Sequence, residues 1–260
     1  MWDFECQVIR QEVLGAGYRT LELDVGEEWT RAAQPGQFVH LRLPNLEASA
    51  LRRPFSIYSA KAGCLRLLYK TVGRGTESMN TLAAGDRVKV MGPIGRGFPA
   101  VRSGLPILVA GGYGVAPLSF LAERIPEKGI AMIGGRTASD ILSRETFEAL
   151  GWQVEVATQD GSLGTEGLVT VVLDRILDDL SSRGQAAELF SCGPDGLLRA
   201  VGDRAISRGV KAWLSLDKHM VCGIGACLAC VQKLRRADGS EWIGRACVDG
   251  PIFESREIVW

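Results

Sequence analysis

Residues 106–117 read Pro-Ile-Leu-Val-Ala-Gly-Gly-Tyr-Gly-Val-Ala-Pro. The run Pro106–Ala110 is continuously apolar, as in a strand that is buried on both faces of a sheet. A glycine-rich turn follows it and leads into a helical pattern over Val115–Arg124. This order predicts the start of a parallel α/β domain whose turn can approach a dinucleotide pyrophosphate, although the turn lacks the G-x-G-x-x-G fingerprint.

Strand-like and helix-like segments alternate after this stretch. Five buried strands joined by crossover helices predict a doubly wound parallel sheet over residues 101–216. Ser191-Cys192-Gly193-Pro194 follows the fourth of these strands, where carboxyl ends border a ligand crevice. The alternative for Cys192 is a small buried residue. The later strands are expected at Ile130–Ile133, Gln153–Ala157, Glu188–Ser191 and Ala212–Leu216, and the later helices near Arg144–Leu150, Val169–Leu180 and Asp195–Ser207.

The first hundred residues follow a different pattern. Short stretches alternate between apolar and polar residues and are separated by turns that contain glycine or proline, so residues 1–100 are predicted to form an antiparallel β-barrel. One short helix is expected at Thr76–Ala83. The alternating stretches are Tyr18–Val25, Gln37–Leu43, Cys64–Tyr69 and Arg87–Met91.

Two motifs in the barrel region could bind a cofactor. Arg53-Pro54-Phe55-Ser56 lies on a predicted strand, where an arginine can neutralise a pyrophosphate and a serine can face a flavin ring. Gly73-Arg74-Gly75-Thr76 runs into the predicted helix, so that the N–H groups of Gly75 and Thr76 could bind phosphate. Taken singly, each motif could equally be an ordinary strand or an ordinary turn.

The cysteines point to a metal site. Four of the seven lie in the last 39 residues, with the spacing Cys222-x4-Cys227-x2-Cys230-x16-Cys247. The C-x4-C-x2-C…C pattern is that of plant-type [2Fe–2S] clusters. A four-cysteine zinc site is the alternative, but zinc sites usually have two C-x2-C pairs; unliganded structural cysteines are the second. Residues 217–260, which have little regular pattern, are expected to form a small metal-stapled subdomain.

The bulk properties exclude several classes of protein. The 260 residues carry equal numbers of acidic and basic side chains, which argues against binding to nucleic acid. No apolar run reaches the roughly 18 residues that a membrane span requires. Residues 1–6 are too acidic and polar for a signal peptide, so a cytoplasmic location is expected.

The motifs occur in the order found in ferredoxin–NADP reductase-like flavoproteins, and the resemblance covers almost the whole chain. The C-terminal cysteines narrow the resemblance to the electron-transfer subunits of NAD-dependent dihydroorotate dehydrogenases. That resemblance implies FAD, a [2Fe–2S] cluster and NAD as cofactors. It also implies a partner subunit that holds FMN and oxidises dihydroorotate in pyrimidine synthesis, in a heterotetramer with two copies of each subunit.

The resemblance also assigns residues to cofactors. Cys192 would lie where the nicotinamide meets the flavin. The resemblance favours NAD, but Arg136 and Arg144 flank the end of the second predicted parallel strand and could meet the 2′-phosphate of NADP. The FAD residues would be Arg53, Pro54, Phe55, Ser56, Leu68, Tyr69, Lys70, Gly75 and Thr76. The NAD residues would be Gly111, Gly112, Gly114, Pro117, Cys192, Gly193 and Pro194, and the cluster ligands would be Cys222, Cys227, Cys230 and Cys247.

Other functions fit parts of the same pattern. The chain also resembles the FAD/[2Fe–2S] subunits of NADH-dependent ferredoxin:NADP reductases and of sulfide dehydrogenases. A stand-alone reductase for an oxygenase and a redox-sensing module without turnover are further alternatives.

No acid–base pair is required for electron transfer, and neither His40 nor His219 lies in a recognisable catalytic arrangement. Both histidines are interpreted as structural or surface residues.

Overall fold

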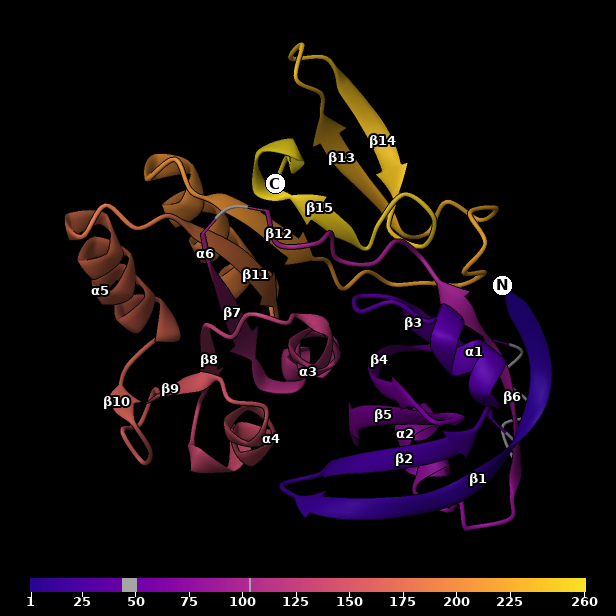
Figure 1. The fold of residues 1–260 in the computed structure, drawn as a ribbon. Helices are drawn as coiled ribbons and strands as arrows, with labels where there is room; N and C mark the ends of the chain where they lie inside the picture. The colour runs from indigo at the N-terminus through magenta and orange to yellow at the C-terminus, as the bar shows by residue number, and fades with distance from the viewer. Residues whose placement is uncertain (44–50, 103) are drawn as a thin grey trace.

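The computed structural model describes residues 1–43, 51–102 and 104–260. The chain folds into a barrel, an α/β domain and a C-terminal segment that lies across both (Figure 1). Along the barrel region the elements are β1 (Trp2–Gly15), β2 (Tyr18–Asp24), α1 (Glu27–Ala32), β3 (Phe38–Arg42), β4 (Arg53–Lys61), β5 (Cys64–Lys70), α2 (Arg74–Met79) and β6 (Arg87–Ile94).

The barrel is closed and antiparallel, as predicted. Its strand order is β1-β2-β5-β4-β3-β6, and β6 pairs with β1 to close it. Alternate side chains point into the barrel, so that Val39 and Leu41 of β3 join its apolar core while Phe38 and His40 face outward. The expected helix at Thr76–Ala83 begins two residues earlier and ends at Met79. Strand β1 and helix α1 were not expected.

The α/β domain has the predicted parallel sheet, with the first strand in its middle. The strand order is β10-β9-β8-β7-β11-β12-β15. Its elements are β7 (Leu105–Gly111), α3 (Val115–Arg124), β8 (Ile130–Gly135), α4 (Arg144–Ala149), β9 (Gln153–Thr158), β10 (Thr165–Glu166), α5 (Val169–Ser182), β11 (Ala187–Cys192), α6 (Asp195–Ser207) and β12 (Lys211–Ser215).

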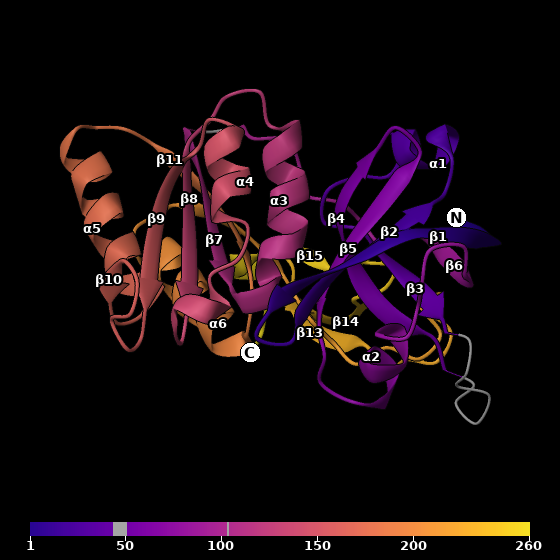
Figure 2. The same ribbon diagram turned by 90° about the horizontal axis from the view of Figure 1, so that it is seen from below.

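Helices cover both faces of this sheet. Ile107 and Val109 of β7 pack against α5 and α6, whereas Leu108 and Ala110 pack against α3 and α4. Because successive strand residues face opposite sides, one continuous apolar run supplies both cores. Helix α3 lies between the sheet and the barrel, and its Phe120 belongs to the barrel core (Figure 2).

The C-terminal segment has more regular structure than its sequence pattern indicates. It forms the antiparallel hairpin of β13 (Val231–Arg235) and β14 (Glu241–Arg245), followed by β15 (Ile252–Glu254). Strand β15 pairs antiparallel with β12 and completes the sheet of the α/β domain. The segment is therefore attached to the neighbouring domain by a strand. No helix within the described ranges is long and apolar enough to cross a membrane.

Candidate functional site

A cavity of about 1500 Å³ lies where the barrel, the α/β domain and the C-terminal segment meet. It is large enough for a dinucleotide, since drug-sized ligands occupy roughly 300–1,000 Å³. Fifteen of the sixteen residues predicted to bind FAD or NAD line this one cavity. They are Arg53, Pro54, Phe55, Ser56, Leu68, Tyr69, Lys70, Gly75, Thr76, Gly111, Gly112, Gly114, Cys192, Gly193 and Pro194.

The barrel side of the cavity combines strand residues with a helix start. Strands β4 and β5 supply the segments around Arg53 and Tyr69, and α2 supplies Gly75 and Thr76. A Cβ atom on Gly75 would come within 3.0 Å of the Arg53 side chain, so the glycine lets the arginine lie over the start of α2. The Thr76 hydroxyl accepts hydrogen bonds from the N–H groups of Val72 and Gly73, and it thereby fixes the turn.

The opposite side of the cavity is the switch point of the parallel sheet. Strands β7 and β11 lie next to each other there, with Ala110 level with Cys192, and the chain leaves them in opposite directions. Ligands of open α/β sheets bind at such points. A Cβ on Gly114 would lie 2.3 Å from the backbone oxygen of Cys192. Only glycine therefore allows the start of α3 to approach β11 this closely.

Cys192 lines the cavity but is not an activated nucleophile. It is buried, and burial raises the pKa of its thiol to about 12, so the thiol is protonated at neutral pH. A reactive cysteine would need a lowered pKa. Cys192 is thus a small buried residue that also lines the cavity.

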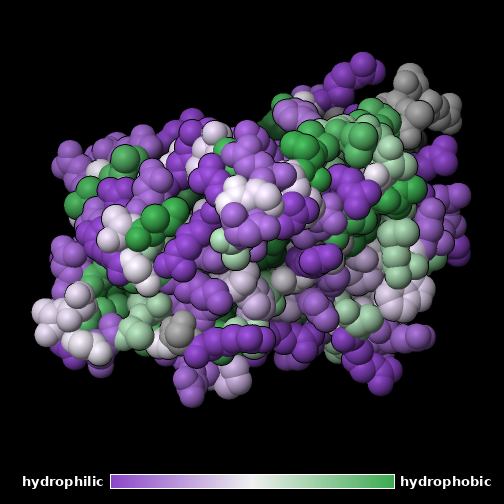
Figure 3. Space-filling model, turned by 90° about the horizontal axis from the view of Figure 1, so that it is seen from above, coloured by the Kyte–Doolittle hydropathy of each residue, from purple (hydrophilic) through white to green (hydrophobic). Residues whose placement is uncertain are grey.

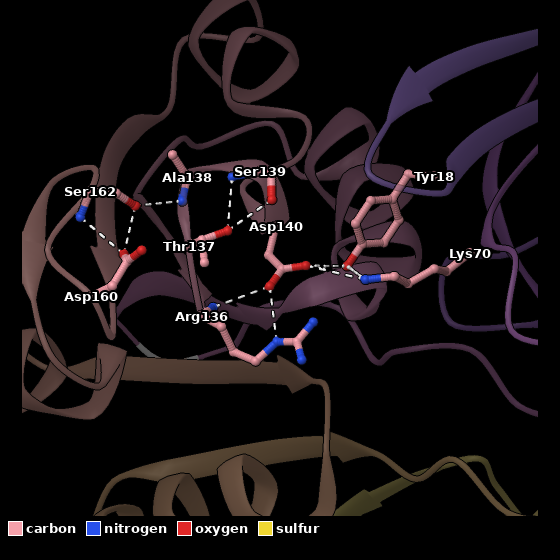
Figure 4. Close-up of polar contacts among 9 residues, drawn as sticks. All are labelled: Tyr18, Lys70, Arg136, Thr137, Ala138, Ser139, Asp140, Asp160 and Ser162. Carbon is pink, nitrogen blue, oxygen red and sulfur yellow. Dashed lines mark hydrogen bonds and ion pairs between the residues drawn. The ribbon is translucent and has the colours of Figure 1, made fainter.

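A buried carboxylate joins the two domains beside the cavity (Figure 4). Asp140, from the loop after β8, accepts hydrogen bonds from Tyr18 Oη at 2.9 Å and from Lys70 Nζ at 3.3 Å, both on the barrel. Its other oxygen accepts from Arg136 Nε at 3.2 Å. Burial alone would raise the pKa of Asp140, but the bonds from Tyr18, Arg136 and Lys70 lower it to about 2.

Two residues from the sequence analysis lie away from the cavity. Pro117 is buried in the first turn of α3 and does not line it. Arg144 is also absent from the lining, and it pairs with Glu148 on its own helix. The sequence missed Tyr18 and Asp140, which are 122 residues apart and meet only through the packing of the domains. Their only local signal was the position of Asp140 shortly after a predicted strand.

The four C-terminal cysteines gather on the outer face of the barrel. Cys230 and Cys247 are buried in an apolar group with Phe38, Met91 and Ile94. Cys222 and Cys227 lie in the loop before β13, and the N–H of Cys227 donates to Cys222 Sγ at 3.4 Å. Across the described parts of the chain, however, no three His, Cys, Asp or Glu side chains converge on one point.

The chemistry of these cysteines nevertheless suits an iron–sulfur cluster. Hydrogen bonds from the backbone N–H groups of Ile224, Cys227 and Ala226 outweigh partial burial and lower the pKa of Cys222 to about 6, which favours the thiolate that binds metal. The loop turns at Gly223 and Gly225, both with positive φ. Arg245 Nη1 donates to the Gly225 carbonyl at 3.3 Å and ties the loop to β14. The residues present therefore fit the cluster that the spacing predicts.

Family models match both ends of the chain. The oxidoreductase FAD-binding domain matches residues 5–98, and the iron–sulfur cluster binding domain of dihydroorotate dehydrogenase B matches residues 217–259. Between them lies the parallel sheet of a ferredoxin–NADP reductase-like fold. Fold and site together define a flavin- and iron–sulfur-dependent oxidoreductase of the electron-transfer type.

Relatives of known name make the assignment more specific. A dihydroorotate dehydrogenase B (NAD(+)) electron transfer subunit from Desulforamulus reducens is 36% identical over 99% of this chain and 98% of its own length. The subunit of the same name from Bacillus cereus is 39% identical over 87% of each chain. The chain belongs to the family of dihydroorotate dehydrogenase B (NAD(+)) electron transfer subunits.

Solved structures agree with this fold. The structure of an NADH-dependent reduced ferredoxin-NADP oxidoreductase is 27% identical, covers 98% of this chain and 90% of its own, and has a TM-score of 0.83. A ferredoxin reductase of carbazole 1,9a-dioxygenase is 21% identical with a TM-score of 0.66, covering 80% of this chain and 66% of its own. The second likeness shows the fold alone.

Proposed function

We propose that this chain transfers electrons to NAD⁺ in pyrimidine synthesis. The electrons would come from a partner subunit that oxidises dihydroorotate. One observation carries the proposal: Phe38 lines the cavity and also packs in the apolar group that contains Cys230 and Cys247. Met220 likewise lines the cavity and packs against this apolar group, so the proposed cofactor cavity adjoins the proposed cluster ligands. When bound, FAD exchanges a hydride with nicotinamide and single electrons with a [2Fe–2S] cluster.

The barrel side of the cavity is the proposed FAD site. Arg53 would neutralise the pyrophosphate together with N–H groups at the start of α2. Phe55 and Tyr69 contact each other edge to face, with ring centroids 6.1 Å apart, and form an aromatic part of the wall. Pro54 and Ser56 of β4, Leu68 and Lys70 of β5, and Gly75 and Thr76 of α2 would complete the site.

The switch point is the proposed nicotinamide dinucleotide site. Gly111, Gly112, Gly114 and Gly193 bring backbone close to the cavity without side chains that fill it, and Pro194 also lines the cavity. Arg136 is the nearby cation that could meet a 2′-phosphate, but its Nε is bound to the Asp140 carboxylate. A carboxylate at this position disfavours a further phosphate, which supports NAD over NADP.

The proposed cluster ligands are Cys222, Cys227, Cys230 and Cys247. Their loop presents exposed apolar side chains from Val221, Ile224 and Leu228. Figure 3 shows hydrophobic side chains gathered on the face of the molecule that carries the C-terminal segment, above the barrel. Apolar side chains that surround a redox centre suit a protein interface. We propose that an FMN-containing catalytic subunit binds there, in a heterotetramer with two copies of each chain.

Co-purification and cofactor analysis test the proposal. The tagged chain, isolated without oxygen from its native cells, is expected to bring an FMN-containing dehydrogenase with it and to contain FAD, iron and sulfide. The complex should reduce NAD⁺ when dihydroorotate is supplied as the electron donor. A colourless protein that contains zinc would overturn the cluster assignment. We place the activity in the cytoplasm, because free cysteines of this number persist in reducing surroundings.

A second candidate follows from the likeness to the NADH-dependent reduced ferredoxin-NADP oxidoreductase, which extends over 98% of this chain. In that case the partner would be a ferredoxin:NADP-linked subunit. The identity to that structure is 27%, against 36% and 39% to the dihydroorotate dehydrogenase subunits. Reduction of NADP⁺ by reduced ferredoxin in the native complex, without oxidation of dihydroorotate, would favour this second function.

A further inference from the structure

A histidine lies on the outer face of the barrel, beneath the loop that contains Cys222 and Cys227, called here the cysteine loop. His40 is in β3, where it pairs with Pro54 of β4 on one side and Met91 of β6 on the other. Its side chain is 0% exposed. Its ring lies 5.6 Å from the ring of Phe38, the residue between the cavity and the buried cysteines. His40 therefore lies beside a residue that contacts both proposed redox sites.

The cysteine loop is built around this imidazole. A Cβ on Gly223 would come within 3.0 Å of His40 Cε1 and 3.1 Å of Nδ1, and within 3.1 Å of the Met91 side chain. Gly223 also has a φ of 71°, which side chains rarely adopt. The residue next to Cys222 is thus a glycine whose backbone rests on the histidine ring.

The imidazole has polar atoms with nothing to bind. Within the described ranges, neither Nδ1 nor Nε2 of His40 has a hydrogen-bond partner. An unsatisfied buried polar group is unfavourable, so each one in a folded protein requires an explanation. Burial, with the nearby charge of Arg52, lowers the pKa of His40 to about 4. An imidazole ring carries at least one N–H donor in either protonation state.

We propose that His40 is a positioning residue of the iron–sulfur site. Its ring supports the Cys222–Cys227 loop on the barrel, and its N–H donates a hydrogen bond to this loop when the cluster is bound. The inference rests on the proposed cluster. Hydrogen bonds toward cluster sulfur raise the reduction potential, because reduction adds negative charge that a donor stabilises. His40 would thus raise the reduction potential of the cluster relative to that of a flavin bound on the other side of Phe38.

The test compares two substitutions at His40 with one at the second histidine. His40→Leu fills the space with an apolar side chain and removes the N–H donor. His40→Asn places an amide near the position of Nδ1. His219→Leu is the matched control, because His219 is exposed. Each holo protein is titrated without oxygen while the cluster is followed by electron paramagnetic resonance and FAD by absorbance, so that FAD serves as an internal reference.

In His40→Leu the equilibrium constant for reducing the cluster is expected to fall about tenfold against FAD, which is ~59 mV for one electron. His40→Asn should restore most of this loss, and His219→Leu should match the wild type. Loss of the cluster from His40→Leu but not from His40→Asn, with FAD retained, also supports the inference. Equal potentials in all four proteins, or equal changes in both His40 variants, would overturn it. A wild type without a cluster would instead refute the proposed function.

Discussion

The α/β domain and the C-terminal cysteine segment are stabilised in different ways. The sheet of the α/β domain has an apolar core on each face, built from alternate residues of the same strands. The cysteine loop has no such core, and the apolar group beside it includes Cys230 and Cys247 themselves. Its other two cysteines, Cys222 and Cys227, are half-buried and exposed.

This difference indicates which region needs its cofactor in order to fold. Burial of apolar surface stabilises the sheet whether or not a dinucleotide is bound. The cysteine loop has few buried contacts, so metal binding would supply much of its stability. A change confined to one region should therefore leave the other region unaffected.

Loss of one ligand should have the largest effect. Cys230→Ser is expected to abolish the cluster and the electron transfer between the partner and NAD⁺, while reduction of an artificial acceptor by NADH at the flavin continues. Iron and sulfide per FAD, with both activities, provide the measurement. Cys64→Ser is the matched control, because Cys64 lies at the start of β5, outside the cysteine segment. A Cys230→Ser protein with a full cluster would contradict the ligand assignment.

Removal of iron should separate the two regions within one molecule. After chelation, amide protons of residues 218–230 are expected to exchange much faster, whereas those of β7 and β11 keep their protection. Hydrogen exchange followed by mass spectrometry measures both regions together. Equal protection of the loop with and without iron would show that apolar contacts alone hold it.

A methyl group at the switch point should destabilise the α/β domain and leave the cluster in place. Gly114→Ala puts a Cβ 2.3 Å from the Cys192 oxygen, and we expect a loss of about 3 kcal/mol in the free energy of unfolding. Gly196→Ala is the control, since a Cβ there meets nothing within 4 Å and should slightly stabilise α6. Urea denaturation measures both; equal stabilities would refute the close approach.

The smallest expected effect concerns the carboxylate that joins the domains. Because the pKa of Asp140 is lowered to about 2, its ionised form stabilises the fold at neutral pH, and this contribution is lost as the pH falls from about 4 toward 2. Asp140→Asn should cost about 2 kcal/mol at pH 7 and progressively less below pH 4. Denaturation of both proteins at several pH values measures this; the control is Asp178→Asn, an exposed ion pair. A pH-independent difference would contradict the assignment.

Local patterns were sufficient for much of the fold but not for contacts between distant segments. The helices at Val115–Arg124 and Asp195–Ser207 have the predicted bounds, because apolar periodicity and glycine turns mark them. Strand β1 was missed because most of its side chains are exposed, which removes the alternation that identifies a strand. Strand β15 has only three residues, and its pairing with β12 is a long-range event.

The same distinction applies to the site. Glycines and the Arg53–Ser56 motif were found in the sequence because a local turn or strand gives each a reason, and these residues do line the cavity. Asp140 and Tyr18 were missed because their partners come from another domain. His40 was interpreted as structural or surface, and it is fully buried; its place under Gly223 depends on a loop 183 positions further along the chain.

We propose that electrons pass between the cavity and the C-terminal cysteines through the region of Phe38. Stopped-flow reduction of the assembled complex by NADH, followed at wavelengths that separate flavin from cluster, tests it most directly. We expect FAD to be reduced first and the cluster to be reduced after it, within the turnover time. A flavin that bleaches while the cluster stays oxidised throughout turnover would contradict it.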